Sequence, residues 1–84
     1  MTALPHPRAR LTLAEVAPGA AACVDSVDAG SPLGRRLLDL GFVPGTEVRV
    51  VRRAPLGDPV EYELRGYRLC LRRSEALQIQ VRPA

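Results

Sequence analysis

The sequence predicts a mainly β fold, a small five-stranded barrel with one short α-helix inserted after the first long strand. Five short segments carry the alternation or the composition that β-strands show, and tight-turn residues separate most of them. A segment after the first of these strands instead repeats leucine at helical spacing. Closing so short a sheet into a barrel removes the exposed edges that invite aggregation, so we expect closure.

The first expected elements are a tail and a long strand. Residues 1–10 hold two prolines, two arginines and a histidine without periodicity, which predicts a flexible N-terminal tail. We expect the folded domain to span 11–84 and its first long strand to span 20–27.

A helix is expected between Ser31 and Gly41. The Ser31 hydroxyl can accept a hydrogen bond from a free amide of the first turn, and Pro32 fits the first helical position. An apolar stripe follows at positions i, i+4 and i+7, formed by Leu33, Leu37 and Leu40. Gly41 suits the left-handed residue that ends many helices.

Four further strands are expected after the helix, at 47–53, 60–65, 67–72 and 77–82. Pro44 and Gly45 predict a type II turn before the first of them, because proline fits its first corner and glycine its second. Gly66 permits a tight reversal, and 73–76 is expected to form a single helical turn.

Composition argues against several function classes. All 12 basic residues are arginine, and a net charge of +3 is too small a basic excess to demand a nucleic acid. No apolar run approaches the roughly 20 residues of a membrane span, and the N-terminus lacks the order of a secretory signal. We therefore expect a cytoplasmic protein without direct membrane insertion.

Catalytic chemistry is not expected either. His6, the only histidine, lies between two prolines in the expected tail, so nothing would hold it beside a nucleophile. The chain has no glycine-rich phosphate loop and no lysine to complete one. The sequence therefore predicts a protein that is not an enzyme.

Three residues are weak candidates for binding a divalent metal such as iron or zinc. Cys23 and Cys70 lie on different expected strands and would form a thiolate pair if a closed barrel made them neighbours. The favoured alternative is that both are reduced thiols buried in the barrel wall, because free cysteine is among the most buried residue types. His6, joined by a carboxylate of another molecule, would bind an ion only adventitiously. The sequence requires no cofactor.

The best candidates for binding a partner lie in and around the loop 54–59. Its leucine stands between two prolines, and a stiff, partly apolar tip loses little entropy when it binds. The candidate residues in the loop are Leu56, Gly57 and Asp58, and those expected behind it are Arg52, Arg53 and Leu38.

Plainer interpretations of the same residues remain open. The loop can be a simple hairpin connection, and the arginines can pair across strands with Glu61 and Glu63. Leu38 lies about 100° around the helix from its neighbour, so it either packs inward beside Phe42 or marks an interface. A monomer and a homodimer are both compatible with the sequence.

Three segments in this order resemble the FeoA family, the small cytosolic component of bacterial ferrous iron transport. They are LGRRLLDLGFVPGTEV at 33–48, APLGDP at 54–59 and GYRLCLRRSEA at 66–76. The resemblance extends from about Leu11 to Val81. It implies an SH3-like barrel with a helix inserted after its first strand. It also implies a partner, the FeoB-type membrane permease, whose cytosolic part carries a GTP-binding domain.

The resemblance therefore implies a non-enzymatic accessory protein of ferrous iron uptake that binds and modulates the permease at the inner face of the membrane. The alternative is an SH3-like regulatory or protein-interaction module related to the C-terminal domain of iron-dependent repressors. A nucleic-acid-binding barrel is disfavoured, because Tyr62 and Tyr67 are its only candidates for base stacking and nearby glutamates would repel a backbone.

Overall fold

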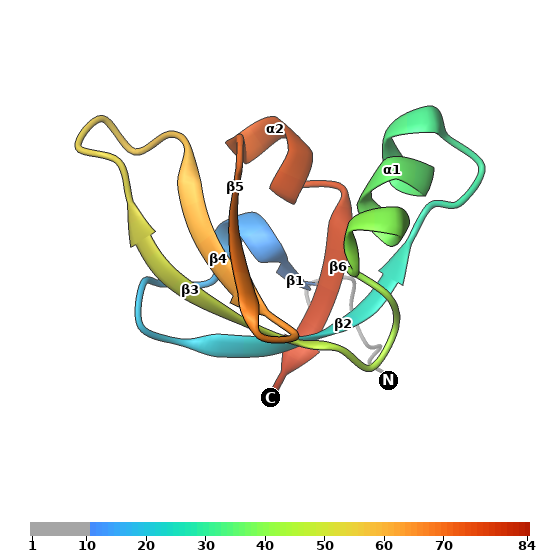
Figure 1. The fold of residues 1–84 in the computed structure, drawn as a ribbon, viewed down its shortest axis with the longest axis horizontal. Coiled ribbons are helices and arrows are strands. Elements are labelled where there is room, and N and C mark those ends of the chain that lie inside the picture. Colours follow the sequence, from blue (N-terminus) through green and yellow to red (C-terminus); the bar gives the residue numbers. More distant parts are fainter. Residues whose placement is uncertain (1–10) are drawn as a thin grey trace, which may run out of the picture.

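One curved antiparallel sheet dominates the computed structural model, which describes residues 11–84 (Figure 1). Its six strands lie in the order β1-β6-β2-β3-β4-β5. The strands are β1 (Leu11–Thr12), β2 (Ala21–Val27), β3 (Glu47–Arg53), β4 (Val60–Leu64), β5 (Tyr67–Leu71) and β6 (Ile79–Pro83). The helices are the 3-10 turn η2 (Leu13–Glu15), α1 (Pro32–Leu40) and α2 (Arg73–Ala76).

The mainly β class with a helix after the first long strand is confirmed. Three details differ from the expectation, and the first is that strand pairing does not close the sheet. The two-residue strand β1 adds a sixth strand, which is too short to produce an alternating pattern. The closing strand starts at Ile79, two residues later than expected. Leu77 still belongs to the last turn of α2, because its amide donates to the Arg73 carbonyl at 2.9 Å. The expected tail at 1–10 lies outside the described residues.

The sheet curls without closing through hydrogen bonds, since β1 and β5 are its two edges. The short helices η2 and α2 contact each other between these edges. Each contributes small or apolar buried side chains, Leu13 and Ala14 from η2 and Ala76 from α2. Helix contact thus completes the enclosure of the core where strand pairing stops.

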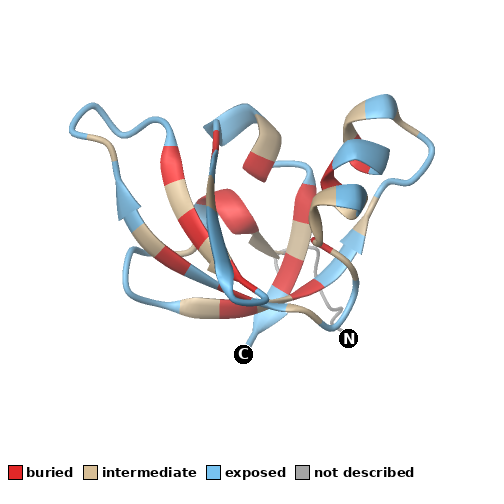
Figure 2. Ribbon diagram, in the orientation of Figure 1, coloured by how far each residue is buried: buried red, intermediate tan, exposed pale blue. Residues whose placement is uncertain are grey.

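The core fills the inside of this curled sheet (Figure 2). Inward positions alternate with exposed or half-buried ones along β4 and at the start of β3, as expected for strands with one face in water. The largest fully buried side chains are Tyr62, Phe42, Leu13, Leu37, Leu64, Ile79, Val24, Val48 and Val50. Tyr62, expected as a stacking candidate, is therefore a core residue.

The helix α1 has the ends that the sequence predicts. The Ser31 Oγ accepts a hydrogen bond from the Gly34 amide at 2.9 Å, and proline occupies the first turn. Gly41 has a φ of +114°, and the amide of Phe42 donates to the Leu37 carbonyl at 3.1 Å. The turn at 43–46 is also confirmed, with Gly45 at a φ of +92°.

Replacing Gly34 by alanine should strongly destabilise the fold. A Cβ at this position would lie 1.7 Å from the backbone oxygen of Asp28, so the backbone itself must move. We expect a loss of about 1–3 kcal/mol or more in the free energy of unfolding, measured by urea denaturation. The exposed neighbour variant Arg35→Ala is the control and should change stability by no more than about 0.5 kcal/mol. Equal stability of the two variants would contradict this close approach of α1 to the Asp28 backbone.

Stability should fall as Tyr62 ionises. Burial raises the pKa of Tyr62 from 10.0 to about 12, with Arg53 and Arg73 opposing the shift and Asp58 adding to it. The neutral phenol is favoured in the fold, so its contribution is complete below pH 10 and is lost between pH 10 and about 12.

The expected slope in that interval is about 1.4 kcal/mol of unfolding free energy per pH unit. Denaturation series of the wild type and Tyr62→Phe measure it, and the variant should lack this component. The chain has no lysine to titrate in the same range. Identical pH profiles for the two proteins would show that unfolding does not change the pKa of this phenol.

Candidate functional site

The loop 54–59 joins β3 to β4 and projects from one end of the sheet (Figure 1). At its base the Ala54 amide donates to the Pro59 carbonyl at 3.0 Å. At its tip the Gly57 amide donates to the Ala54 carbonyl at 2.7 Å, and Gly57 has a φ of +93°, which favours glycine. These bonds hold Leu56 outward, with 96% of its surface exposed.

Asp58 ties the loop to a distant part of the chain. Its Oδ1 accepts a hydrogen bond from the backbone amide of Arg73 at 2.8 Å, at the start of α2. The sequence placed Asp58 beside Leu56 as a binding residue, but the structure shows that its carboxylate already has a partner within the protein. This bond connects the loop to the first residue of α2.

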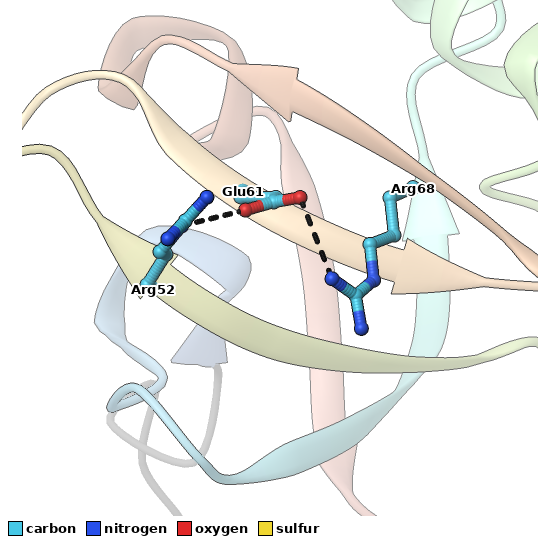
Figure 3. A network of polar contacts seen from close by, with 3 residues as sticks. All are labelled: Arg52, Glu61 and Arg68. Carbon is cyan, nitrogen blue, oxygen red and sulfur yellow. Dashed lines mark hydrogen bonds and ion pairs between the residues drawn. The ribbon is translucent and has the colours of Figure 1, made fainter.

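The two arginines at the end of β3 differ in their surroundings. The Arg52 Nε donates to Glu61 Oε1 at 2.9 Å, and the Arg68 guanidinium lies 3.9 Å from the other Glu61 oxygen (Figure 3). A register shift between Val50 and Arg52 brings Arg52 opposite Glu61. Arg52 remains 78% exposed, so this pair contributes at most about 1 kcal/mol. Arg53 is also exposed and faces Val60 in the register.

A hollow of about 400 Å³ lies beside the base of the loop. It is lined by Arg52, Arg53, Ala54, Pro55, Pro59, Glu61 and Cys70. The hollow therefore brings together both candidate arginines and a cysteine from β5. A larger hollow, of about 590 Å³, lies between the turns at 45–46 and 65–66 and includes none of the candidate residues.

The expectation that both cysteines are buried is wrong. Cys70 is exposed, because it occupies an outward position of β5 opposite Glu61. Cys23 is half-buried on β2, with its Sγ 3.9 Å from the Gly45 carbonyl oxygen. The proposed thiolate pair is not formed, since β3 and β4 lie between β2 and β5 in the sheet.

The metal-binding side chains of residues 11–84 are scattered and not clustered. This part of the chain contains no cluster of three or more histidine, cysteine, aspartate or glutamate side chains able to hold an ion. The remaining candidate, His6, lies outside the described residues. The described residues therefore offer an iron or zinc ion no such cluster of ligands.

Leu38 is not part of the loop surface. It is half-buried on α1, which lies at the other end of the long axis of the molecule from the loop (Figure 1). The half-buried Leu33 and Leu40 of the same helix pack against the core, whereas Leu38 is not among the side chains that do. Of the six candidates, five therefore gather at the loop.

Within residues 11–84, no helix is both long and apolar enough to span a membrane.

Comparison with known proteins connects this fold to one family. A family model described as the FeoA domain matches residues 11–83. The chain is 38% identical over 71 residues to a protein of Porphyromonas gingivalis named Fe(2+) transport protein A/Fe(2+) transporter FeoB fusion protein. That alignment covers 84% of this chain and only 8% of the much longer relative.

Solved structures agree. A FeoA-like protein from Clostridium acetobutylicum is 39% identical, with a TM-score of 0.83 over 88% of this chain and 86% of the other. FeoA of Stenotrophomonas maltophilia, solved with zinc and described as an SH3 domain protein, is 40% identical, with a TM-score of 0.75 over 84% of this chain and 88% of the other.

A manganese-dependent transcriptional repressor shares the fold alone, with 19% identity and a TM-score of 0.79 over 95% of this chain and 39% of the repressor. The fold is thus the SH3-like barrel that the resemblance implied. The family model spans nearly all of the described residues, and its relatives share both sequence and fold along that length. On these grounds the chain belongs to the FeoA domain family.

Proposed function

We propose that this chain is a non-enzymatic cytosolic accessory protein of ferrous iron uptake. It binds the cytosolic region of a FeoB-type permease, is recruited by it to the inner face of the membrane, and modulates its GTP-binding domain. The fusion protein of Porphyromonas gingivalis supports this partner, because its name joins the two activities in a single chain. The observation that carries the proposed binding site is the almost complete exposure of Leu56 at the tip of an anchored loop.

The energetics of the loop support a role in binding. Covering an exposed leucine contributes about 1.5–3 kcal/mol, which is a large share of the affinity of a small interface. The hydrogen bonds within the loop and the bond from Asp58 to the Arg73 amide hold the tip in one conformation before binding. Binding therefore loses less conformational entropy than it would with an untethered loop.

Charge next to the tip supplies a second element of recognition. Arg53 and the largely exposed Arg52 lie at the end of β3, where the loop begins. Their guanidinium groups can pair with carboxylates on a partner and so orient it around Leu56. We assign to Asp58 the role of positioning the loop and to Gly57 the role of permitting its turn.

Iron enters this proposal as the cargo of the transport system. We assign the proposed role to protein contact because the exposed tip of the loop supports it. The zinc in the Stenotrophomonas maltophilia structure belongs to that protein.

Replacing Leu56 by aspartate should weaken binding to the permease by at least about tenfold, because an apolar contact is lost and a charge is placed in the interface. The measurement is a calorimetric titration of the cytosolic domain of the cognate permease, with GDP and with a non-hydrolysable GTP analogue. Leu77→Asp is the matched control, since Leu77 is also exposed, at 40%, but lies outside the loop.

The two ways in which this experiment can fail are distinct. Wild-type binding that Leu56→Asp leaves unchanged would remove the contact from the loop. An absence of wild-type binding in both nucleotide states would contradict the proposed partner domain itself.

Replacing Asp58 by alanine should release the loop from α2. Loss of the acceptor for the Arg73 amide should lower the free energy of unfolding by about 0.5–2 kcal/mol and speed hydrogen exchange at that amide. Binding to the permease should weaken by less than in Leu56→Asp. Asp58→Asn keeps an acceptor oxygen and is the matched control. Weaker binding with unchanged exchange at Arg73 would instead mean that Asp58 contacts the partner directly.

A further inference from the structure

We propose that the free edge of β5 binds an extended acidic segment of another polypeptide by adding it to the sheet as a further strand. β5 stands at one end of the strand order and pairs with β4 alone. The opposite edge strand, β1, has only two residues. β5 forms no ladder with a second strand, and α1 packs against β2, with its end at Gly41 lying near the Tyr67 hydroxyl of β5.

The hairpin geometry identifies the backbone groups that are free. The turn between β4 and β5 consists of Arg65 and Gly66, both at positive φ, so Leu64 and Tyr67 form the first hydrogen-bonded pair. Hydrogen-bonded and non-bonded pairs alternate in an antiparallel ladder. The amides and carbonyls of Arg68 and Cys70 therefore point away from β4.

These backbone groups are not engaged by other hydrogen bonds of the described structure. No turn, loop or side-chain hydrogen bond found within residues 11–84 involves the backbone of Arg68 or Cys70. Two amides and two carbonyls thus stand along one edge, at the alternate spacing that an incoming strand uses.

The charge of this edge favours an acidic ligand. The segment 65–73, RGYRLCLRR, carries four arginines and no acidic residue. Of the neighbouring glutamates, Glu61 binds Arg52 at 2.9 Å and Glu75 lies 3.5 Å from Arg36, whereas Glu63 lies opposite Arg68 in the β4–β5 register and offsets part of this charge. The Arg68 side chain is 57% exposed. Its contact with Glu61 is long, at 3.9 Å, and Glu61 also binds Arg52, so most of the charge of Arg68 is available to a ligand.

The side chains of β5 specify the pattern of the added strand. Tyr67, Leu69 and Leu71 alternate with Arg68 and Cys70, and Leu69 and Leu71 face the core side of the sheet. Neighbouring residues in paired strands share a face. A segment of about five residues that alternates apolar and acidic side chains would place the apolar ones beside Leu69 and the acidic ones beside Arg68.

Two other occupants fit the edge less well. Pairing of β5 with β5 of a second copy would bring the four arginines of each chain together. A nucleic acid would match the positive charge but would leave the outward carbonyls facing its phosphates. This inference goes beyond the proposed function, because it concerns the backbone edge of β5 and not the Leu56 tip, and it needs no permease.

The test uses the full chain and a synthetic seven-residue peptide of alternating valine and glutamate with blocked ends. Amide hydrogen exchange is followed by NMR. In the free protein, Arg68 and Cys70 should exchange faster than Leu69 and Leu71. Saturation with the peptide should slow exchange at Arg68 and Cys70 by at least about tenfold, as new hydrogen bonds form. A valine–lysine peptide of the same length should have no such effect.

Variants separate the backbone contribution from the charge. Arg68→Glu should weaken binding of the acidic peptide about tenfold, whereas Arg82→Glu, the same change on β6, should leave it within about twofold. Cys70→Pro removes an outward amide without removing a hydrogen bond to β4, and it should weaken binding about three- to tenfold relative to Cys70→Ala. Should Cys70→Pro fail to fold, a peptide N-methylated at alternate residues tests the same hydrogen bonds on the wild-type protein.

Several results would overturn the proposal. Binding of the acidic peptide without protection of the β5 amides would place it elsewhere. Equal losses in Arg68→Glu and Arg82→Glu would show only a general charge effect. Protection that rises with protein concentration alone would indicate a second copy as the occupant. Protection of the same amides by oligouridylate, but not by the peptide, would indicate a nucleic acid.

Discussion

The need to enclose one apolar face determines the rest of this structure. Each strand of the sheet has one side that is apolar, and a flat sheet would leave that side in water. The sheet instead curls until Tyr62, Phe42 and Leu37 lie inside it. Where strand pairing ends, η2 and α2 contact each other and complete the enclosure. A chain this small has little apolar surface to spare, so almost every inward position belongs to the core.

This use of the inner face leaves recognition to the outer face, the loops and the sheet edge. The loop 54–59 and the edge of β5 represent two different solutions. The loop presents a single apolar side chain, Leu56, held by hydrogen bonds at its base, at its tip and to α2. The edge presents backbone groups framed by arginines, and its specificity lies in charge and alternation. A partner that engaged both would need a compact surface for one and an extended segment for the other.

Local sequence signals predicted the regular elements well because short-range physics determines them. The cap at Ser31, the left-handed Gly41 and the turn at 43–46 are each defined within a few residues. The strand expected at 47–53 and the helical turn at 73–76 have the predicted bounds. The closing strand was placed two residues early, because the alternation of Leu77 with Ile79 continues through the end of a helix.

The sequence by itself determined the class of fold, the helix and its caps, and the loop that carries Leu56, because periodicity and turn chemistry act within one element. Only the tertiary structure decided which residues from different elements meet. In the folded chain Asp58 accepts a hydrogen bond from the amide of Arg73, fifteen residues away. Cys23 and Cys70 lie on strands that are separated by two others. Leu38 lies on α1, at the opposite end of the molecule from the loop, and β5 is an edge strand of the sheet. The reason is that strand order and curvature follow from packing of the whole core, which no local pattern encodes.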